Sequence, residues 1–361
     1  MKSMSTYLLI DIGAGTMDIL YWDDASALHY KAVVRSPVPY LAEKINKCAG
    51  DILITGVEMG GGNITGVLKE RARSHRVVIT EAASATLHHD KDRIAAWGIE
   101  VVGEEEAQTM LTGSRFNHFI TADIGLARLE KIVKGLGVPF AFDVVGICAQ
   151  DHGVPPKGVS HLDYRHRLFT AVLDEDPHAY ALLYDRDAVP QTMNRLTSIA
   201  RSAEGFPAKE VFVMDSGMAA IQGAALDSFA RGRDCVAVLD VATSHTLGAT
   251  LQNGEIAGFF EYHTSEINGA KVDRLLKDLA DGRLSHRQIL EEGGHGVYLR
   301  KAVGFPAIEN IIATGPRRAL IADSSLPMAH GAPMGDNMMT GTLGLLSAIR
   351  IRKGLEHVPI C

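Results

Sequence analysis

The amino-acid sequence predicts an α/β protein in which one strand–turn–strand unit occurs twice. The first unit covers residues 8–22, where an apolar strand ends in Asp11, a Gly-rich turn follows and a second strand begins. The second unit covers residues 234–251 and repeats this order around Asp240. Between and after the two units, short buried strands alternate with helices, a pattern typical of α/β domains. A unit that recurs at a distance within one chain indicates a duplicated domain.

The length and composition indicate a globular protein with more than one hydrophobic core. A chain of 361 residues is too long for one simple core, and its 46% hydrophobic and 22% charged residues are ordinary for a globular protein. The net charge of −7 argues against a nucleic-acid or anionic-membrane partner. No apolar run reaches about 18 residues and no signal-peptide core is present, so we expect a cytoplasmic protein.

The spacing of the cysteines supports the same compartment. Cys48, Cys148, Cys235 and Cys361 lie far apart, and no two of them form a Cys-x-x-Cys pair. This spacing fits a reducing compartment and argues against a Cys-ligated zinc site or iron–sulfur cluster within one chain.

The turn of the first unit has the residues expected of a phosphate-binding hairpin. Gly13 and Gly15 allow positive φ and let backbone N–H groups approach an anion. The carboxylate of Asp11 is compatible with a phosphate only if a cation lies between them, and proteins usually hold Mg²⁺ through one or two carboxylates and water. The alternative is an ordinary glycine turn in a hairpin.

Two further segments carry polar or glycine-rich sequence directly after a predicted buried strand. Residues 51–56 form such a strand, and Gly60 and Gly61 precede a predicted helix over residues 64–73, whose start would bind an anion unless the glycines only make a tight turn. The strand over residues 140–149 runs into Gln150, Asp151 and His152. Open α/β sheets keep their sites at such strand ends, although capping and turn formation explain the same residues.

Residues 81–135 are predicted to be mainly helical, with His88 and His89 on a solvated helix face or in a loop rather than in a metal site. A strand over residues 210–214 leads through residues 215–217 into a helix of small residues, 218–225, which permits a close approach to another backbone unless alanine serves there only as a helix former. After the second unit come helices over residues 269–290, a glycine loop that contains Gly294, and a strand that ends in Thr314 and Gly315.

This order of segments resembles the actin/sugar kinase/Hsp70 ATPase superfamily over essentially the whole chain. The matching segments are residues 8–18, 211–224, 236–250, 311–318 and 340–349. The resemblance implies two duplicated ribonuclease H-like domains with a central nucleotide cleft, spanning residues 1–215, with an inserted substrate-side segment, and 216–361. It implies ATP and Mg²⁺ as cofactors, with Asp11 and Asp240 holding the metal through water.

The residues that this resemblance assigns to the nucleotide lie in the two turns and after the last strand. They are Asp11, Gly13, Ala14, Gly15, Thr16, Asp240, Thr243, Ser244, Thr314 and Gly315. We also expect Gly294 to lie near the nucleotide. The sequence departs from the superfamily pattern at Pro316, where a second glycine is usual, and in the second turn, residues 241–245, where glycine is commoner. Both departures predict altered nucleotide binding.

A narrower resemblance concerns the phosphoryl acceptor. Residues 145–153 look like the strand-Gln-x-His-Gly segment of carbohydrate kinases such as xylulokinase. Those enzymes use an Asp in a Trp-x-Asp-x-Arg setting as base, and the equivalent here is Asp163, with Asp151 as the competing candidate. Gln150, His152, Gly60 and Gly61 would then lie near the substrate.

The chain is also similar to an uncharacterised group labelled pyruvate formate-lyase-activating proteins. That label would imply a radical-SAM Cys-x-x-x-Cys-x-x-Cys motif, which the sequence lacks. The sequence therefore leaves three functions open: a kinase for a small hydroxylated metabolite, an ATPase whose domain motion activates or reactivates a partner enzyme, and a nucleotide binder without turnover. A homodimer is compatible with each of them.

Overall fold

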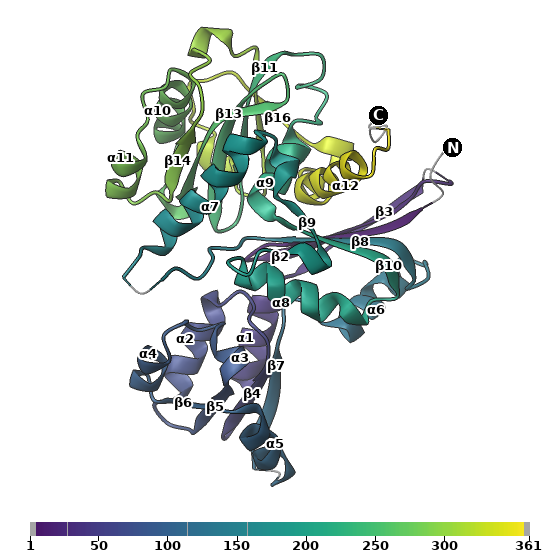
Figure 1. Ribbon diagram of the computed structural model, residues 1–361, viewed down its shortest axis with the longest axis vertical. Coiled ribbons are helices and arrows are strands. Elements are labelled where there is room, and N and C mark those ends of the chain that lie inside the picture. Colours follow the sequence, from purple (N-terminus) through teal and green to yellow (C-terminus); the bar gives the residue numbers. More distant parts are fainter. Residues whose placement is uncertain (1–4, 27, 114, 157, 357–361) are drawn as a thin grey trace.

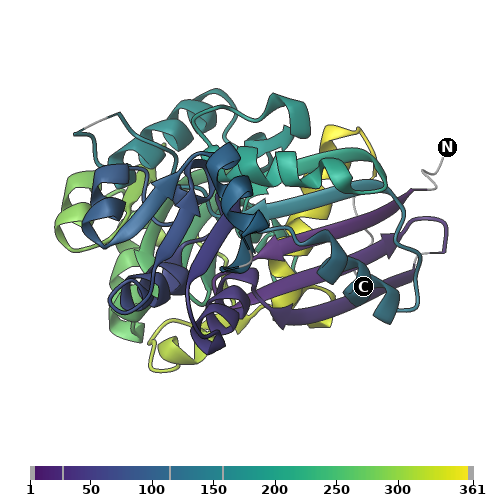
Figure 2. The same ribbon diagram turned by 90° about the horizontal axis from the view of Figure 1, so that it is seen from below.

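The computed structural model describes residues 5–26, 28–113, 115–156 and 158–356 and arranges them around three β-sheets (Figure 1). The first sheet consists, in spatial order, of β3 (Leu28–Arg35), β2 (Thr16–Asp23), β1 (Thr6–Ile12), β8 (Phe142–Ala149), β10 (Ala208–Asp215) and β9 (Leu183–Asp185). β3, β2 and β1 are antiparallel to one another, whereas β1, β8 and β10 are parallel. Figure 2 shows the long strands of this sheet side by side.

The second sheet repeats this topology. It consists of β14 (Gly296–Leu299), β13 (Glu255–His263), β12 (His245–Gln252), β11 (Cys235–Val241), β15 (Asn310–Thr314) and β16 (Met328–His330). β13, β12 and β11 are antiparallel, and β11, β15 and β16 are parallel, in the same order as the first sheet. The predicted duplication is confirmed, because β13, β12, β11, β15 and β16 repeat the arrangement of β3, β2, β1, β8 and β10.

The burial of the strands explains their positions. Tyr7, Leu8, Leu9 and Ile10 of β1 are fully buried, as expected for a central strand that is covered on both faces. One face of the first sheet packs against α12 (Thr340–Arg352), and the other contacts α8 (Asn194–Ser202) and α6 (Leu126–Gly135). β3 lies at the sheet edge and is mostly exposed, as its alternating sequence predicts.

The second sheet is covered by α10 (Gly269–Ala280), by α7 (His161–Glu175) and α11 (His286–Glu291) near β14, and by α9 (Ser216–Ala224). α9 and α12 cross each other between the two sheets. A Cβ atom at Gly223 would lie 1.9 Å from the carbonyl oxygen of Thr340, and one at Gly344 would lie 1.9 Å from that of Ala219. The close helix approach that the small residues predict is confirmed.

The third sheet is formed within residues 36–125, between strands of the first sheet. It has the parallel order β6 (Ile99–Val102), β5 (Val77–Thr80), β4 (Ile52–Gly56) and β7 (Asn117–Thr121). Its helices are α1 (Pro37–Lys47), α2 (Gly62–Arg71), α3 (Glu81–Ser84), α4 (Lys91–Ala96) and α5 (Glu104–Thr112).

The prediction of helices over residues 81–135 missed β6 and β7. Both strands are short, and β7 is largely exposed, so neither gives a clear apolar run. None of the helices in the described part of the chain combines the length and the apolar character that a membrane span requires.

Candidate functional site

The two hairpin turns have the same hydrogen bond and face each other. The first hairpin turn, residues 13–16, is closed by a bond from Gly13 N to Thr16 O of 3.0 Å. The second hairpin turn, residues 242–245, is closed by a bond from Ala242 N to His245 O of 3.1 Å. A Cβ atom at Gly15 would lie 3.0 Å from Cγ2 of Thr243 in the other turn. The two copies of the unit are therefore in contact through their turns.

A cleft of about 410 Å³ lies at this meeting point. Most of the residues assigned to nucleotide by the resemblance line it, namely Asp11, Gly13, Ala14, Thr16, Asp240, Thr243, Ser244 and Gly315. Gly15 and Thr314 are not among its lining residues, but Gly15 contacts the second turn and the hydroxyl of Thr314 donates a hydrogen bond of 3.0 Å to Oδ1 of Asp240. The structure thus brings the two aspartates of the duplicated units into one cleft.

The carboxyl groups of Asp11, Asp18 and Asp240 in this cleft lack a cationic partner. Burial raises the pKa of Asp11 to about 7, opposed by a hydrogen bond from the Cys148 thiol and assisted by the charge of Asp240. Burial also raises the pKa of Asp240 to about 6, and burial with the charge of Asp11 raises that of Asp18 to about 8. Within the described residues, none of these three carboxylates has a Lys, Arg or His at ion-pair distance.

Two glycines are required where the backbone approaches these aspartates. A Cβ atom at Gly341, in the first turn of α12, would lie 2.0 Å from Oδ2 of Asp11. Gly315 has φ of +90°, and a Cβ there would lie 2.4 Å from the carbonyl oxygen of Val241. Pro316 follows it at the cleft wall. The absence of side chains at 341 and 315 therefore leaves room for both carboxylates in the cleft.

The raised pKa values predict how the stability of the ligand-free protein depends on pH. Above about pH 4 an unfolded aspartate is ionised, whereas folded Asp18 keeps its proton up to a pKa of about 8. The folded state then binds more protons, so this group contributes stability that is lost as the pH rises through that interval. Asp18→Asn should flatten the decline of the melting temperature between pH 5 and pH 8, and equal slopes in the two proteins would contradict the assignment.

The polar segment after β8 also lines the cleft, through Gln150, Asp151 and His152. Both carboxylate oxygens of Asp151 accept backbone hydrogen bonds, from Gly153 N at 2.7 Å and from Leu196 N at 2.9 Å. Asp151 therefore ties the segment to the first turn of α8. This is the capping role that the sequence left open as the alternative to a catalytic one.

Asp163, the other candidate base, is not among the residues that line the cleft. It lies in the first turn of α7, and its Oδ1 is 2.9 Å from Nε2 of His286 in α11. Its assignment as base stays a prediction without support from its position. Gly294 is not a lining residue either, because a Cβ there would lie 2.5 Å from Ile289 and 2.7 Å from Tyr262, which it packs against.

The third sheet contributes the outer end of the cleft. Gly60 and Gly61 line it, and a Cβ at Gly61 would lie 2.2 Å from the carbonyl oxygen of Thr86. His89 lies in the loop between α3 and α4, is exposed, and its Nε2 is 3.0 Å from Oε1 of Glu58. The cleft thus extends from the hairpin turns to the inserted segment.

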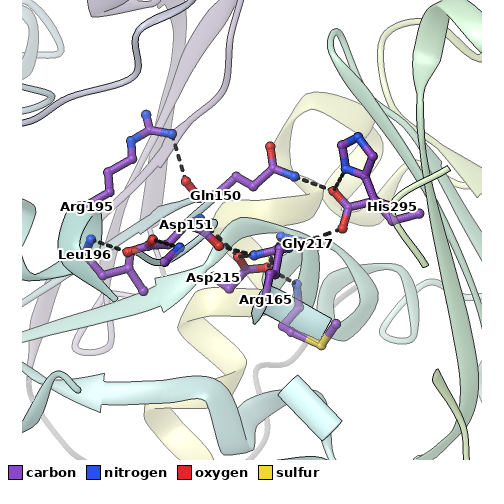
Figure 3. A network of polar contacts seen from close by, with 11 residues as sticks. Gln150, Asp151, Arg165, Arg195, Leu196, Asp215, Gly217 and His295 are labelled. Carbon is purple, nitrogen blue, oxygen red and sulfur yellow. Dashed lines mark hydrogen bonds and ion pairs between the residues drawn. The ribbon is translucent and has the colours of Figure 1, made fainter. Parts of the chain in front are cut away.

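A buried ionic network supports the polar segment that follows β8 (Figure 3). It was not predicted from the sequence. Arg165 of α7 donates to Oδ2 of Asp215 at 2.9 Å and to Oε2 of Glu261 at 3.4 Å, and all three side chains are buried. It also donates to the carbonyl oxygen of Asp151. Burial alone would raise the pKa of Glu261, but the Arg165 guanidinium outweighs it and holds this pKa well below its usual range.

Arg195 forms a second such contact. Its Nε and Nη2 donate to the two oxygens of Asp123 at 2.8 and 2.9 Å, and its Nη1 donates to Gln150 O at 2.9 Å. The partners of Arg165 and Arg195 lie far from them in the sequence. The only local signal of the network is that Asp151 and Asp215 lie at the ends of two parallel neighbouring strands.

Comparisons with known proteins give similar solved structures and one family. Among curated proteins none matches the sequence. The solved structures that resemble the chain include the ethanolamine utilization protein EutJ from Carboxydothermus hydrogenoformans, with 10% identity, 94% of this chain and 88% of that chain covered, and a TM-score of 0.33. They also include the ROK hexokinase from Thermus thermophilus, with 15% identity, 70% and 48% covered, and a TM-score of 0.22.

The sequence itself gives a stronger match than these structures do. Residues 59–320, more than half of the chain, match the model of the family described as "Putative pyruvate format-lyase activating enzyme (DUF1786)". The chain therefore belongs to this family.

Proposed function

We propose that the protein binds a nucleoside triphosphate with Mg²⁺ between the two hairpin turns and cleaves the bond to its γ-phosphoryl group. The observation that carries this proposal is the meeting of the two turns, with Gly15 against Thr243 and with Asp11 and Asp240 in one cleft. Two equivalent turns on opposite walls suit a ligand with two ends, such as a polyphosphate chain.

The charge of the cleft supports a cation in this ligand. Asp18 is buried and Asp11 and Asp240 are partly buried; the charge of Asp240 raises the cost of ionising Asp11, and both of these charges raise the cost of ionising Asp18. A bare polyphosphate would be repelled by them, whereas Mg²⁺ is held by carboxylates and water and neutralises phosphate oxygens when it is bound. The residues fit this ion, because Gly341 leaves the carboxylate of Asp11 free to face the cleft. Asp11 and Asp240 would hold it.

The acceptor of the phosphoryl group is a small hydroxylated metabolite in the first form of this proposal. The cleft continues past the turns to Gly60, Gly61 and Arg195, which gives a compact polar molecule a place beside the nucleotide. The hydrogen-bonding side chains at this end of the cleft are held in place by contacts within the protein, such as the two hydrogen bonds from Arg195 to Asp123. Such preorganised groups are suited to orient a substrate for in-line transfer.

Water is the acceptor in the second form, in which nucleotide hydrolysis drives a domain motion that acts on a partner enzyme. The position of the two candidate bases favours it. Asp163 is paired with His286 outside the lining of the cleft, and both oxygens of Asp151 already accept backbone N–H groups. Neither carboxylate is poised to accept a proton from a substrate hydroxyl.

The experiment measures nucleotide hydrolysis with and without Mg²⁺, and in the presence of a panel of polyols and hydroxy acids. We expect Mg²⁺-dependent turnover. A stoichiometric phosphorylated product with one compound selects the kinase, and turnover that no compound changes selects the ATPase. Nucleotide binding without turnover, or turnover that is indifferent to chelation of Mg²⁺, would contradict the proposed cleavage.

A further inference from the structure

Three histidines from separate segments converge at one side of the cleft. His152 follows β8, His245 is the first residue of β12, and His295 directly precedes β14. One ring nitrogen of each lies within 4.8 Å of those of the other two. His152 and His245 line the cleft, and His295 lies behind them, buried.

One ring nitrogen of this triad has no partner within the described part of the protein. Nε2 of His245 is buried and makes no hydrogen bond to a described residue, whereas Nδ1 of His295 faces Oε1 of Glu261 at 3.5 Å. Nδ1 of His245 lies 2.8 Å from the hydroxyl of Ser244, so a proton on Nδ1 leaves the lone pair of Nε2 unused. A buried polar atom without a partner is costly, and a bound ion would remove that cost.

Two members of the triad, His152 and His245, are in the protonation state that binds metals. Burial lowers the pKa of His152 to about 3 and that of His245 to about 4, helped by the positive charge of Arg165. These imidazoles are therefore neutral at neutral pH. Neutral imidazole is the form that donates a lone pair to a metal ion.

A carboxylate stands behind the triad, as is usual at histidine metal sites. Oε1 of Glu261 lies 3.5 Å from Nδ1 of His295, and the carbonyl oxygen of Glu261 accepts a hydrogen bond of 2.8 Å from His295 N. Glu261 is itself held by Gln150 and Arg165. Arg165 carries one positive charge between the carboxylates of Asp215 and Glu261, so this network leaves one negative charge beside the triad.

We propose that His152, His245 and His295 bind a divalent transition-metal ion of the zinc type, with an open coordination position toward the cleft. Imidazole sets select Zn²⁺, Fe²⁺, Ni²⁺ or Cu²⁺ over Mg²⁺, which prefers oxygen. In a tetrahedral zinc site with bonds of about 2.0–2.1 Å, the nitrogens lie about 3.4 Å apart. The observed spacing requires the rings to close in by roughly an ångström, which side-chain rotation supplies.

This site is distinct from the magnesium site of the proposed function. Three histidine ligands with a free fourth position are the arrangement of zinc sites that take water or a substrate oxygen. Because two of the histidines line the same cleft as Asp11 and Asp240, the free position would take an oxygen of the acceptor or of the nucleotide. The site does not depend on whether the nucleotide is turned over.

Titration of metal-stripped protein with Co²⁺ in excess Mg²⁺ tests the proposal. We expect one equivalent to bind, with visible ligand-field absorption that Zn²⁺ abolishes. His152→Asn, His245→Asn and His295→Asn should each weaken Co²⁺ binding by more than about 100-fold, since loss of an outer-sphere partner alone costs about 10- to 100-fold. His29→Asn, on exposed β3, is the matched control and should bind as the wild type does.

Several results would overturn this assignment. One is a folded wild-type protein without the absorption band, and another is triad variants that keep wild-type affinity and a native circular dichroism spectrum. A loss of Co²⁺ binding in Asp11→Asn would mean that the ion occupies the carboxylates instead. Glu261→Gln, which keeps the hydrogen-bonding shape, should lower the affinity by about 10- to 100-fold, and no change would remove its outer-sphere role.

Discussion

Asp11→Asn and Asp240→Asn are each expected to lower Mg²⁺-ATP hydrolysis by about 100-fold or more, the size of effect seen when one preorganised charge-stabilising group is removed. Asparagine keeps the shape of the carboxyl group but cannot neutralise a cation. The ligand-free variants should melt at the wild-type temperature or above it, because burial already raises the pKa of both carboxyls and penalises their charge. Steady-state turnover and thermal unfolding measure the two effects.

Asp23→Asn is the matched control for these variants. Asp23 is the last residue of β2, at the other end of the same hairpin, where it bonds to Ser26 and Ala25 on the surface. It should keep full turnover. Wild-type turnover in both Asp11→Asn and Asp240→Asn would remove the carboxylates from the site, and unfolding of either variant would contradict the claim that their charges are unfavourable in the ligand-free state.

Gly344→Ala is expected to destabilise the protein by about 3 kcal/mol or more, at the upper end of the cost of overpacking. A methyl group there would lie 1.9 Å from the carbonyl oxygen of Ala219 and 2.6 Å from Gly223 N. These contacts are with backbone, so no side-chain rotation relieves them and α9 and α12 must separate. Gly223→Ala meets the carbonyl oxygen of Thr340 in the same way. Urea denaturation measures the loss.

Gly66→Ala is the control, and it is expected to change the stability in the opposite direction. Gly66 is exposed in the interior of α2, and a Cβ there would meet nothing within 4 Å. Gly66→Ala should therefore stabilise the protein by about 0.5–1 kcal/mol through the higher helix propensity of alanine. A Gly344→Ala protein as stable as the wild type would mean that the two helices are free to part, contrary to their packing.

The duplicated core was predictable because its signals are local. An apolar strand, an aspartate and a turn of small residues lie within a dozen positions in each copy, and the small residues of α9 and α12 show that the helices approach closely. β7 was missed because three of its five residues are exposed, so its sequence contains no long apolar run. A short exposed strand is recognisable only from the strand with which it pairs.

The substrate side of the site was predicted less well, because its contacts are long-range. Arg165 lies 50 residues from Asp215 and 96 from Glu261, and nothing near Arg165 marks it as buried. The histidine triad is likewise assembled only by the fold. Asp163 stays a prediction from its motif-like setting, and in the structure Ser160 caps α7 and the Asp163 carboxylate contacts His286 of α11.

The central claim is that one metal–nucleotide unit binds between Asp11 and Asp240. A crystal structure of the protein with a non-hydrolysable ATP analogue and Mn²⁺ tests it most directly, because the anomalous signal of manganese locates the ion. We predict a manganese peak between the two carboxylates, next to phosphates that contact both hairpin turns. Bound nucleotide whose phosphates touch neither turn, or a manganese ion that neither aspartate approaches, would contradict the claim.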